Sequence, residues 1–301
     1  WGTLIEGFSS QGQGYHALEL FEALQNEGIC PNKVILLFIM KACSAEGFLG
    51  QGMVLHDQVI RASFELDLAL GSALIYMYGK CGSLVDSEII FNQLSSRDVV
   101  VWNAMISVYA WHGHGHRILE IFDKMQTEGL SPDAITFSCI LTACGNIGAI
   151  DKANQIHDEI LTRRLLEKNI VLGNGMVDMY VRFGLLKIAL AVFDNIPTRN
   201  IVSWNALITG YADNEHAEEV LKCFEQMQLE GISPTLITYV CVLKACSRTG
   251  ELNKGKQVHN EISFKGLLEQ ENLILSNALV GMYATCGAFS EAQKAFDELS
   301  L

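Results

Sequence analysis

The stretch VVVWNAMISVYA, residues 99–110, recurs as IVSWNALITGYA at residues 201–212. Its large apolar side chains are spaced i, i+3, i+4 and i+7 from Trp102 to Tyr109, which predicts a helix with one buried face. The same spacing returns from Ile118 to Met125, after a glycine-containing turn. The two segments together predict a pair of helices joined by a short connection.

The second helix of this pair is followed by a stop signal. Gly129 comes after the apolar segment and Pro132 lies three residues further on, an order that is common beyond the end of a helix. Matching stops occur at Gly28 with Pro31 and at Gly231 with Pro234. The helical pair is therefore expected to be a repeated unit.

The chain also repeats over a longer interval, of 101 or 102 residues. The residues that mark this interval are Trp1, Trp102 and Trp204; Cys43, Cys144 and Cys246; and His56, His157 and His259. The interval is about three times the length of a helical-pair repeat, so we expect three related units within each. In residues 99–200 these units are 35, 36 and 31 residues long.

The same division extends over the whole chain. It predicts nine units, truncated at both ends, at residues 1–32, 33–67, 68–98, 99–133, 134–169, 170–200, 201–235, 236–272 and 273–301. A single helical pair cannot bury its apolar face, whereas stacked pairs bury a continuous core, in keeping with 50% hydrophobic and 18% charged residues. We therefore expect an all-α fold: a single α-solenoid of stacked helix-turn-helix repeats over residues 1–301.

Composition restricts the class of protein further. The longest apolar run, Val34–Met40, has seven residues, far fewer than the roughly 20 that span a bilayer, so we expect a soluble protein. Trp1 stands at the start without a charged or Arg/Ser-rich leader, and any targeting segment is expected to have been removed or left out. Nine cysteines without a CxxC pair favour a reduced compartment. The net charge of −13 argues against a broadly basic nucleic-acid-binding surface.

These motifs resemble a known family, the pentatricopeptide repeat proteins of plant organelles, in the subclass that alternates standard, long and short motifs. The two stretches quoted first correspond to the standard motif, LTAC at Leu141 and LKAC at Leu243 to the long motif, and GNGMVDMY at Gly173 to the short motif. The resemblance covers essentially the whole chain. A tetratricopeptide array, the nearest rival, has a 34-residue period and would not alternate 35, 36 and 31 residues.

The resemblance implies binding of single-stranded RNA, one base per repeat, with the protein's N-terminus toward the RNA 5′ end. It implies that the fifth and last residues of a repeat read the Watson–Crick edge of one base, and unpaired bases do expose donors and acceptors that two or three side chains can match. The implied base-reading residues are Ser72 with Asp98, Asn103 with Asp133, Ser138 with Asn169, Asn174 with Asn200, Asn205 with Thr235, and Asn277, whose partner lies beyond Leu301. The second residue of each unit is implied to pack against the faces of the bases: Val100, Val171, Val202 and Ile274, with a smaller Ala69.

Each pair is associated in the family with a base. Ser72 with Asp98 implies guanine, Asn103 with Asp133 uracil, Ser138 with Asn169 adenine and Asn174 with Asn200 cytosine, while Asn205 and Asn277 favour a pyrimidine. Three pairs depart from the pattern and are expected to leave their bases unread: Gly2 with Asn32, Leu37 with Asp67, and Val240 with Asn272. The expected target, from 5′ to 3′, is unread, unread, G, U, A, C, pyrimidine, unread, pyrimidine.

Several of these residues have simpler interpretations. The asparagines at the fifth positions could be helix N-caps, a role that Asn fills well; against this, Trp204 precedes Asn205 inside what looks like a first turn. His112, His114 and His116 resemble a metal site, but they lie in a turn with no carboxylate or cysteine placed to complete a tetrahedral set, so no metal and no cofactor is expected. The histidines and cysteines that recur once in each long motif are expected to do one structural job three times.

No nucleophile-base set, phosphate-binding glycine-rich loop or HxE...CxxC deaminase signature occurs, so the chain is not expected to be an enzyme. Members of the three-motif subclass commonly direct C-to-U editing of organelle transcripts, sometimes with a deaminase-like C-terminal extension. The resemblance thus implies the specificity module of RNA editing or other transcript processing in a mitochondrion or chloroplast. The implied partners are single-stranded RNA and editing-complex proteins, with no membrane and no small-molecule substrate. A helical-repeat protein-protein interaction scaffold, with a peptide along its concave groove, is the alternative.

We predict that Asn103→Thr shifts the preference at the fourth base from U toward G, because the pair would then resemble Ser72 with Asp98. By analogy with base readout elsewhere, a good polar pair contributes about 1–3 kcal/mol of discrimination. A gel-shift series with four RNAs that differ at this base measures the change. Identical base rankings for the parent and the variant would show that the assigned register is wrong.

Overall fold

The computed structural model describes residues 1–61, 67–268 and 273–297. Within these residues the chain forms eighteen α-helices and one short 3₁₀ turn and contains no β-strand, which confirms the predicted all-α fold. No described helix combines the length and the apolar character that crossing a membrane requires. The contacts of the chain divide it into two compact units, unit 1 (Trp1–Ala143) and unit 2 (Cys144–Leu301).

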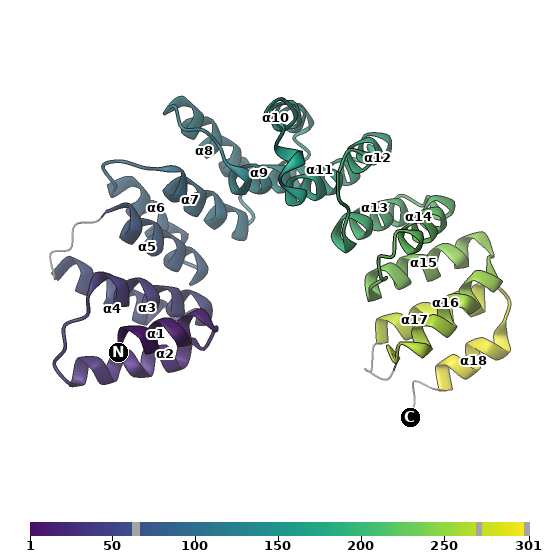
Figure 1. Ribbon diagram of the computed structural model, residues 1–301, viewed down its shortest axis with the longest axis horizontal. Helices are drawn as coiled ribbons and strands as arrows, with labels where there is room; N and C mark the ends of the chain where they lie inside the picture. Colours follow the sequence, from purple (N-terminus) through teal and green to yellow (C-terminus); the bar gives the residue numbers. More distant parts are fainter. Residues whose placement is uncertain (62–66, 269–272, 298–301) are drawn as a thin grey trace. The chain divides into compact units, whose positions relative to one another are not determined.

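The helices follow one another in pairs separated by short connections (Figure 1). Unit 1 contains α1 (Gly2–Ser10), α2 (Gly14–Asn26), α3 (Lys33–Glu46), α4 (Leu49–Arg61), α5 (Leu68–Lys80), α6 (Leu84–Gln93), α7 (Val99–Trp111), α8 (Gly115–Thr127) and most of α9 (Ala134–Ile147). Unit 2 contains the end of α9, then α10 (Ile150–Thr162), η1 (Leu165–Glu167), α11 (Ile170–Arg182), α12 (Leu186–Asp194), α13 (Ile201–Asp213), α14 (Ala217–Leu229), α15 (Leu236–Thr249), α16 (Leu252–Phe264), α17 (Leu273–Thr285) and α18 (Phe289–Asp297).

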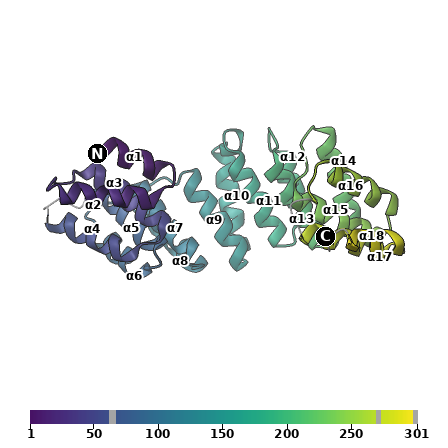
Figure 2. The same cartoon turned by 90° about the horizontal axis from the view of Figure 1, so that it is seen from below.

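Each unit is built from two layers of helices (Figures 1 and 2). In unit 1 the odd-numbered helices from α1 to α7 each pack against the next odd-numbered helix, and the same holds from α11 to α17 in unit 2. The even-numbered helices form the second layer. In this layer each of α2, α4 and α6 in unit 1, and of α12, α14 and α16 in unit 2, contacts its own odd-numbered partner and the next odd-numbered helix. Large side chains that are almost completely buried fill the space between the layers, among them Trp102, Phe122, Tyr180 and Phe224. Burial of such a side chain contributes about 1.5–3 kcal/mol.

The first helix of most pairs begins at a polar capping residue. The side chains of Asn32, Asp67, Asp98, Asn169 and Asn200 each accept a hydrogen bond from a backbone N–H in the first turn of the helix that follows, over 2.9–3.0 Å. A cap of this kind contributes about 1 kcal/mol because it satisfies a donor that has no partner within the helix. The second helices whose caps are described begin without a side-chain cap, so the two kinds of helix start are chemically distinct.

The predicted stop signals lie directly beyond helix ends. Helix α8 ends at Thr127 and Gly129 follows with a φ of 79°, while α14 ends at Leu229 and Gly231 has a φ of 72°. This left-handed conformation favours glycine because it has no Cβ. The glycine therefore turns the chain away from the second helix toward the next pair.

The histidines that recur in the long motifs join neighbouring pairs. His56 on α4 bonds the hydroxyl of Tyr78 on α5 over 2.9 Å, and His157 and His259 bond Tyr180 and Tyr283 over 2.6 and 2.8 Å. Burial lowers the pKa of His56 and of His157, which favours the neutral ring. These three bonds are the recurring structural role that the sequence predicts.

The recurring cysteines lie in the core. Cys43, Cys144 and Cys246 are fully buried, and burial raises the pKa of their thiols to about 12, 11 and 11. A thiol that stays protonated is a poor nucleophile and a poor metal ligand. These residues therefore act as small apolar side chains at tight helix contacts.

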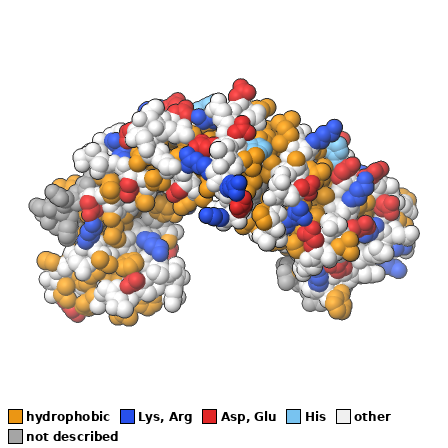
Figure 3. All heavy atoms as spheres, turned by 45° about the horizontal axis from the view of Figure 1, so that its top comes forward, with side chains coloured by type: hydrophobic (Ala, Val, Ile, Leu, Met, Phe, Trp, Pro, Cys, Tyr) orange, Lys and Arg blue, Asp and Glu red, His pale blue; other side chains and the backbone are white. Residues whose placement is uncertain are grey.

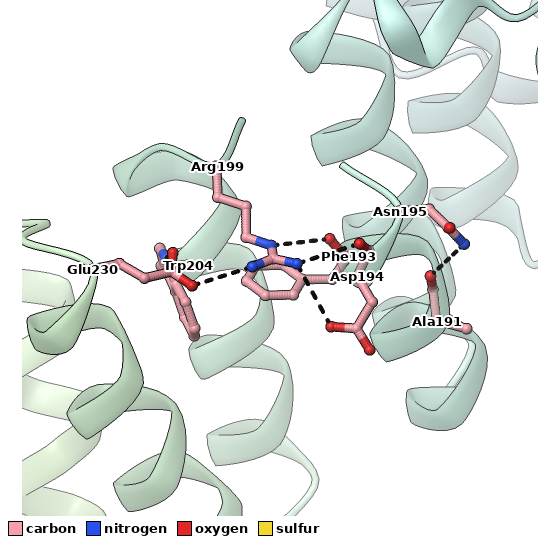
Figure 4. A network of polar contacts seen from close by, with 7 residues as sticks. All are labelled: Ala191, Phe193, Asp194, Asn195, Arg199, Trp204 and Glu230. Atoms are coloured by element: carbon pink, nitrogen blue, oxygen red, sulfur yellow. Dashed lines mark hydrogen bonds and ion pairs between the residues drawn. The ribbon is translucent and has the colours of Figure 1, made fainter. Parts of the chain in front are cut away.

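An arginine closes the junction between α12 and α13 (Figure 4). The Arg199 guanidinium lies 4.8 Å from the centre of the Phe193 ring and donates to the carbonyl oxygens of Phe193 and Asp194, each over 3.2 Å. It also donates to Glu230 Oε1 over 3.1 Å, while the indole Nε1 of Trp204 donates to Glu230 Oε2 over 3.2 Å. One carboxylate thus connects the end of α14 to both the preceding connection and α13.

The corresponding junction in unit 1 is less complete. Arg97 lies 4.6 Å from the centre of the Phe91 ring and donates to the Phe91 carbonyl over 2.9 Å, as Arg199 does to Phe193. However, Arg97 Nη1 is 3.9 Å from Glu128 Oε1, and the buried indole Nε1 of Trp102 has no hydrogen-bond partner among the described residues. Only the unit 2 junction therefore uses its glutamate as a double acceptor.

Two odd-numbered helix pairs approach closely at glycine. A Cβ placed on Gly210 of α13 would lie 2.4 Å from Cγ2 of Val181 on α11, and one on Gly79 of α5 would lie 2.2 Å from Cγ2 of Val108 on α7. Both distances are far below van der Waals contact, so a larger residue cannot enter without moving the helices apart.

We predict that Gly210→Ala destabilises the protein by about 1–3 kcal/mol through overpacking, although alanine favours a helix over glycine by about 1 kcal/mol. Val181→Ala in the same chain should restore most of the loss, because it removes the methyl groups that collide. Gly281→Ala in α17, where nothing lies within 4 Å, is the control and should be stabilising. Urea unfolding followed by circular dichroism measures all three, and an unchanged midpoint for Gly210→Ala would contradict the close approach.

We predict that Glu230→Ala costs about 1–2 kcal/mol of stability, because it removes two hydrogen bonds to a half-buried carboxylate. Glu128→Ala, at the same place in unit 1, should change stability by less than about 0.5 kcal/mol, since its ion pair is long and its side chain is 47% exposed. Thermal melts of the two variants against the parent make the comparison. Equal losses would show that both junctions depend on their glutamates alike.

Candidate nucleic-acid interface

The asparagines at the fifth positions lie inside helices, one turn from the start. Asn103, Asn174 and Asn205 belong to α7, α11 and α13, whose N-caps are Asp98, Asn169 and Asn200. The interpretation of these three asparagines as helix caps is therefore wrong. The capping residues are instead the last residues of the preceding predicted repeats.

Asn103 is the centre of a polar cluster in unit 1. Its side-chain Nδ2 donates to both carboxylate oxygens of Asp133, each over 3.0 Å. Its Oδ1 accepts a hydrogen bond of 2.6 Å from the hydroxyl of Thr136, the third residue of the next predicted repeat. Asp133 also caps α9 by accepting from the backbone N–H of Thr136 over 2.9 Å. The fifth and last residues of the repeat are thus in direct contact.

Asn174 forms a similar cluster in unit 2. Its Oδ1 accepts from the Ser203 hydroxyl over 2.6 Å, and its Nδ2 donates to Asn200 Oδ1 over 3.5 Å. The same Asn200 oxygen caps α13 by accepting from the backbone N–H groups of Val202 and Ser203. Because this oxygen already accepts hydrogen bonds from within the protein, the side-chain NH₂ of Asn200 is the part that can bind a ligand.

Asn205 forms the third cluster. Its Nδ2 donates to the Thr235 hydroxyl over 3.0 Å, and its Oδ1 accepts from the Thr238 hydroxyl over 2.6 Å. Thr235 is the last residue of the predicted repeat and Thr238 the third residue of the next. Asn205 and Thr235 are therefore brought together in the same way as the other two pairs.

The remaining predicted pairs are arranged differently. The Ser72 hydroxyl donates to the Ala69 carbonyl of its own helix over 3.1 Å, while Asp98 caps α7. Ser138 lies in unit 1 and Asn169 in unit 2. Asn277 is exposed on α17, and Asn272 lies outside the described residues.

The predicted base-packing residues all lie on the surface. Val100, Val171, Val202 and Ile274 are between 55% and 71% exposed, and the smaller Ala69 is exposed as well. Sequence reasoning missed three residues at the same second position of the long units, which are 55–59% exposed: Val34, Ile135 and Ile237. The signal that could have found them is the apolar second residue of each of the eight predicted units from residue 33 onward. Each of these eight units exposes an apolar side chain three residues before its fifth residue.

The last predicted reader borders a cavity. Ile274 and Asn277 line a space of about 440 Å³ together with Val240, Lys244 and Ser247 of α15. Its walls combine an apolar side chain, an amide, a hydroxyl and an ammonium group. Such a site can receive a flat ring with polar edges.

The surface charges are of both signs. Acidic, basic and apolar side chains are interspersed over the face seen in Figure 3. Among the described residues, no group of three His, Cys, Asp or Glu side chains is placed to hold a metal ion. The His112 ring bonds the Gly79 carbonyl over 3.1 Å, which connects its turn to α5.

Together, each of the three asparagine clusters and its exposed second residue can bind a planar heteroaromatic ring. The apolar side chain can cover one face of the ring, while the amide and the last residue bind its edge. Unpaired nucleobases have this combination of an apolar face and a polar edge.

Comparison with solved structures finds the same fold. A crystal structure of the pentatricopeptide repeat protein PPR10 in complex with an 18-nt psaJ RNA element matches 99% of this chain and 49% of that chain, with a TM-score of 0.74 and 18% identity. A crystal structure of PPR10 from maize matches 100% of this chain and 58% of that chain, with a TM-score of 0.56. At this level of identity the likeness concerns the fold alone, an α-solenoid.

Sequence relatives cover the same range. The chloroplastic pentatricopeptide repeat-containing protein At4g18520 of Arabidopsis thaliana is 33% identical over 99% of this chain and 48% of its own length. The mitochondrial pentatricopeptide repeat-containing protein At3g09040 of the same plant is 31% identical over 99% of this chain and 29% of its own length. The chain thus spans less than half the length of these relatives.

Two family models match the chain at the repeats. The model described as the PPR repeat family matches residues 97–146 and 199–248, and the PPR repeat model matches residues 1–29, 174–201 and 237–267. Together they cover more than half of the chain and include all residues of the three asparagine clusters. The chain therefore belongs to the PPR repeat family.

Proposed function

We propose that this chain binds single-stranded RNA in a sequence-specific manner, with one base at each repeat. The observation that carries the proposal is the asparagine cluster that recurs three times, each beside an exposed apolar residue at the second position. The division into repeats is supported by the helix bounds, since first helices begin at residues 33, 68, 99, 134, 170, 201, 236 and 273. The RNA complex of PPR10, a protein with the same fold, adds support by family membership.

The clusters differ in what their last residues offer to a base. Asp133 has only acceptors, and these match the N3–H donor of uracil. Asn200 has its side-chain NH₂ available, and this donor matches the N3 acceptor of cytosine. The asparagine at the fifth position adds a donor for the O2 carbonyl that both pyrimidines carry. The chemistry of the clusters therefore agrees with U at Asn103 and C at Asn174.

The net charge of the chain indicates how phosphate contacts and base contacts contribute to RNA binding. With a net charge of −13, we expect few phosphate contacts and a shallow dependence of affinity on salt. Recognition then depends mainly on base contacts.

The proposal extends to the biological role. We assign the chain to the subclass with alternating standard, long and short motifs, and to the specificity module of C-to-U editing or other processing of organelle transcripts. The alternation of 35, 36 and 31 residues and the chloroplastic and mitochondrial relatives support this role. Any deaminase activity would belong to a part of the protein outside this chain.

We predict that the protein enriches RNAs containing G-U-x-C from a randomised single-stranded pool, because two clusters and the Ser72 unit read those bases. Sequencing of the bound RNA measures the enrichment. The variant with Asn103→Ala, Asn174→Ala and Asn205→Ala should lose the preference for pyrimidines at the corresponding bases. Asn92→Ala, an exposed asparagine on α6, is the matched control and should leave the enriched sequence unchanged.

The outcome that would overturn the proposal is an unenriched pool with the parent protein. In that case a peptide along the same groove, rather than RNA, would be the better ligand to seek.

A further inference from the structure

We propose that a buried hydroxyl group in the following repeat sets the orientation of each base-reading asparagine and thereby determines its base preference. The positioning residues are Thr136, Ser203 and Thr238, each the third residue of a repeat. This inference rests on the proposed RNA-binding function, and it assigns specificity to residues that do not face the RNA.

The hydrogen bonds leave the hydroxyl proton one main acceptor. Thr136 Oγ1 accepts from the backbone N–H of Asp133 over 3.2 Å, and its own proton is directed to Asn103 Oδ1 over 2.6 Å. Ser203 accepts from Asn200 N–H over 3.2 Å and donates to Asn174 Oδ1 over 2.6 Å. A hydroxyl has only one proton, so the short contact to the amide oxygen is where it is used. Contacts of 3.0 Å or more to the capping side chain are the weaker alternative.

The third copy has the same geometry. Thr238 accepts from the Thr235 N–H over 3.0 Å and donates to Asn205 Oδ1 over 2.6 Å. All three hydroxyl residues have no exposed surface, while Asn103 and Asn174 are 8% and 9% exposed. The hydroxyls therefore act on a base only through the asparagine.

As a consequence, the side-chain amide of the asparagine has a fixed orientation. With Oδ1 held inward by the hydroxyl and one Nδ2 proton bound by the last residue, the second Nδ2 proton is the group left to meet a base. Turning the Asn103 amide over would place its oxygen against the Asp133 carboxylate, where two acceptors repel. The hydroxyl thus makes the asparagine a hydrogen-bond donor toward the base, which matches the O2 of a pyrimidine.

The sequence of the chain supports the coupling. All three repeats that have an asparagine at the fifth position and a described successor are followed by a hydroxyl at the third position of the next repeat. In the other five repeats the fifth residue is Gly2, Leu37, Ser72, Ser138 or Val240, and the corresponding third residue is Ile35, Leu70, Val101, Leu172 or Leu275. These apolar residues are buried as well. The position is therefore always part of the core, and it carries a hydroxyl only where an asparagine can accept its proton.

The first test removes the hydroxyl while keeping the shape of the side chain. Thr136→Val should reduce the preference for U at the fourth base about tenfold and leave the ranking at other bases unchanged. Thr136→Ser keeps the hydroxyl and should retain the preference. Thr142→Val, an exposed hydroxyl on the same helix that bonds only its own backbone, is the matched control. Fluorescence anisotropy with RNAs that differ only at the fourth base gives the ranking.

The second test builds the cluster where it is absent. Ser72→Asn alone gives the third base an asparagine reader without the hydroxyl, and Ser72→Asn with Val101→Thr completes the Asn103 arrangement with Asp98 as the last residue. We expect the double variant to prefer U at the third base about tenfold more strongly than the single variant. This test holds even if Thr136→Val lowers the stability of the protein, since it truncates no core side chain of an existing cluster.

The outcomes separate the two proposals. A parent protein with no base preference overturns RNA recognition itself. If the parent prefers U and the Thr136→Val variant keeps the same base preference as the parent, the positioning role alone is overturned. A loss of affinity that is equal for all four bases would mean that the hydroxyl supports the fold and not the base preference, and it would overturn the inference too.

Discussion

The hydrogen bond that caps most of the first helices is the interaction on which the rest of the structure depends. It places the last residue of one repeat at the start of the next helix, where Asp133, Asn200 and Thr235 meet the asparagine of the preceding helix. Without that bond the last residue of a repeat would not be held beside the asparagine, and the polar clusters would not form. Burial of the apolar faces stabilises the stack, but it is non-directional and would not select these contacts. The capping hydrogen bond is directional, and it selects these contacts.

Much of the fold could be predicted from the sequence because the signals are local. The spacing of apolar residues, the glycine stops and the period of the chain predict an all-α repeat fold, and the helices agree with it. The division into two compact units within α9 has no such signal.

The candidate site could be predicted only in part, for a related reason. The identity of Asn103 is equally compatible with a cap and with a reader, and only its place one turn inside α7 separates the two roles. Thr136 was not predicted because it belongs to the next repeat and looks like an ordinary helix residue. Two junctions with the same Arg and Trp also differ: Glu230 is bonded to both Arg199 and Trp204, whereas Glu128 leaves Trp102 Nε1 without a partner. The donor–acceptor distances at the two junctions differ by a few tenths of an ångström to an ångström, and residue identity alone does not predict such differences.

The dual position of the last residue restricts how such a protein can acquire new targets. A residue that must cap a helix is chosen from Asp, Asn, Ser and Thr, and these are also the side chains proposed to read the base edge. Variation at this position is therefore confined to four residue types, each of which can cap the helix and so preserves the fold. A change of target costs little stability, and a lineage of such proteins can explore new RNA sequences without first repairing the fold.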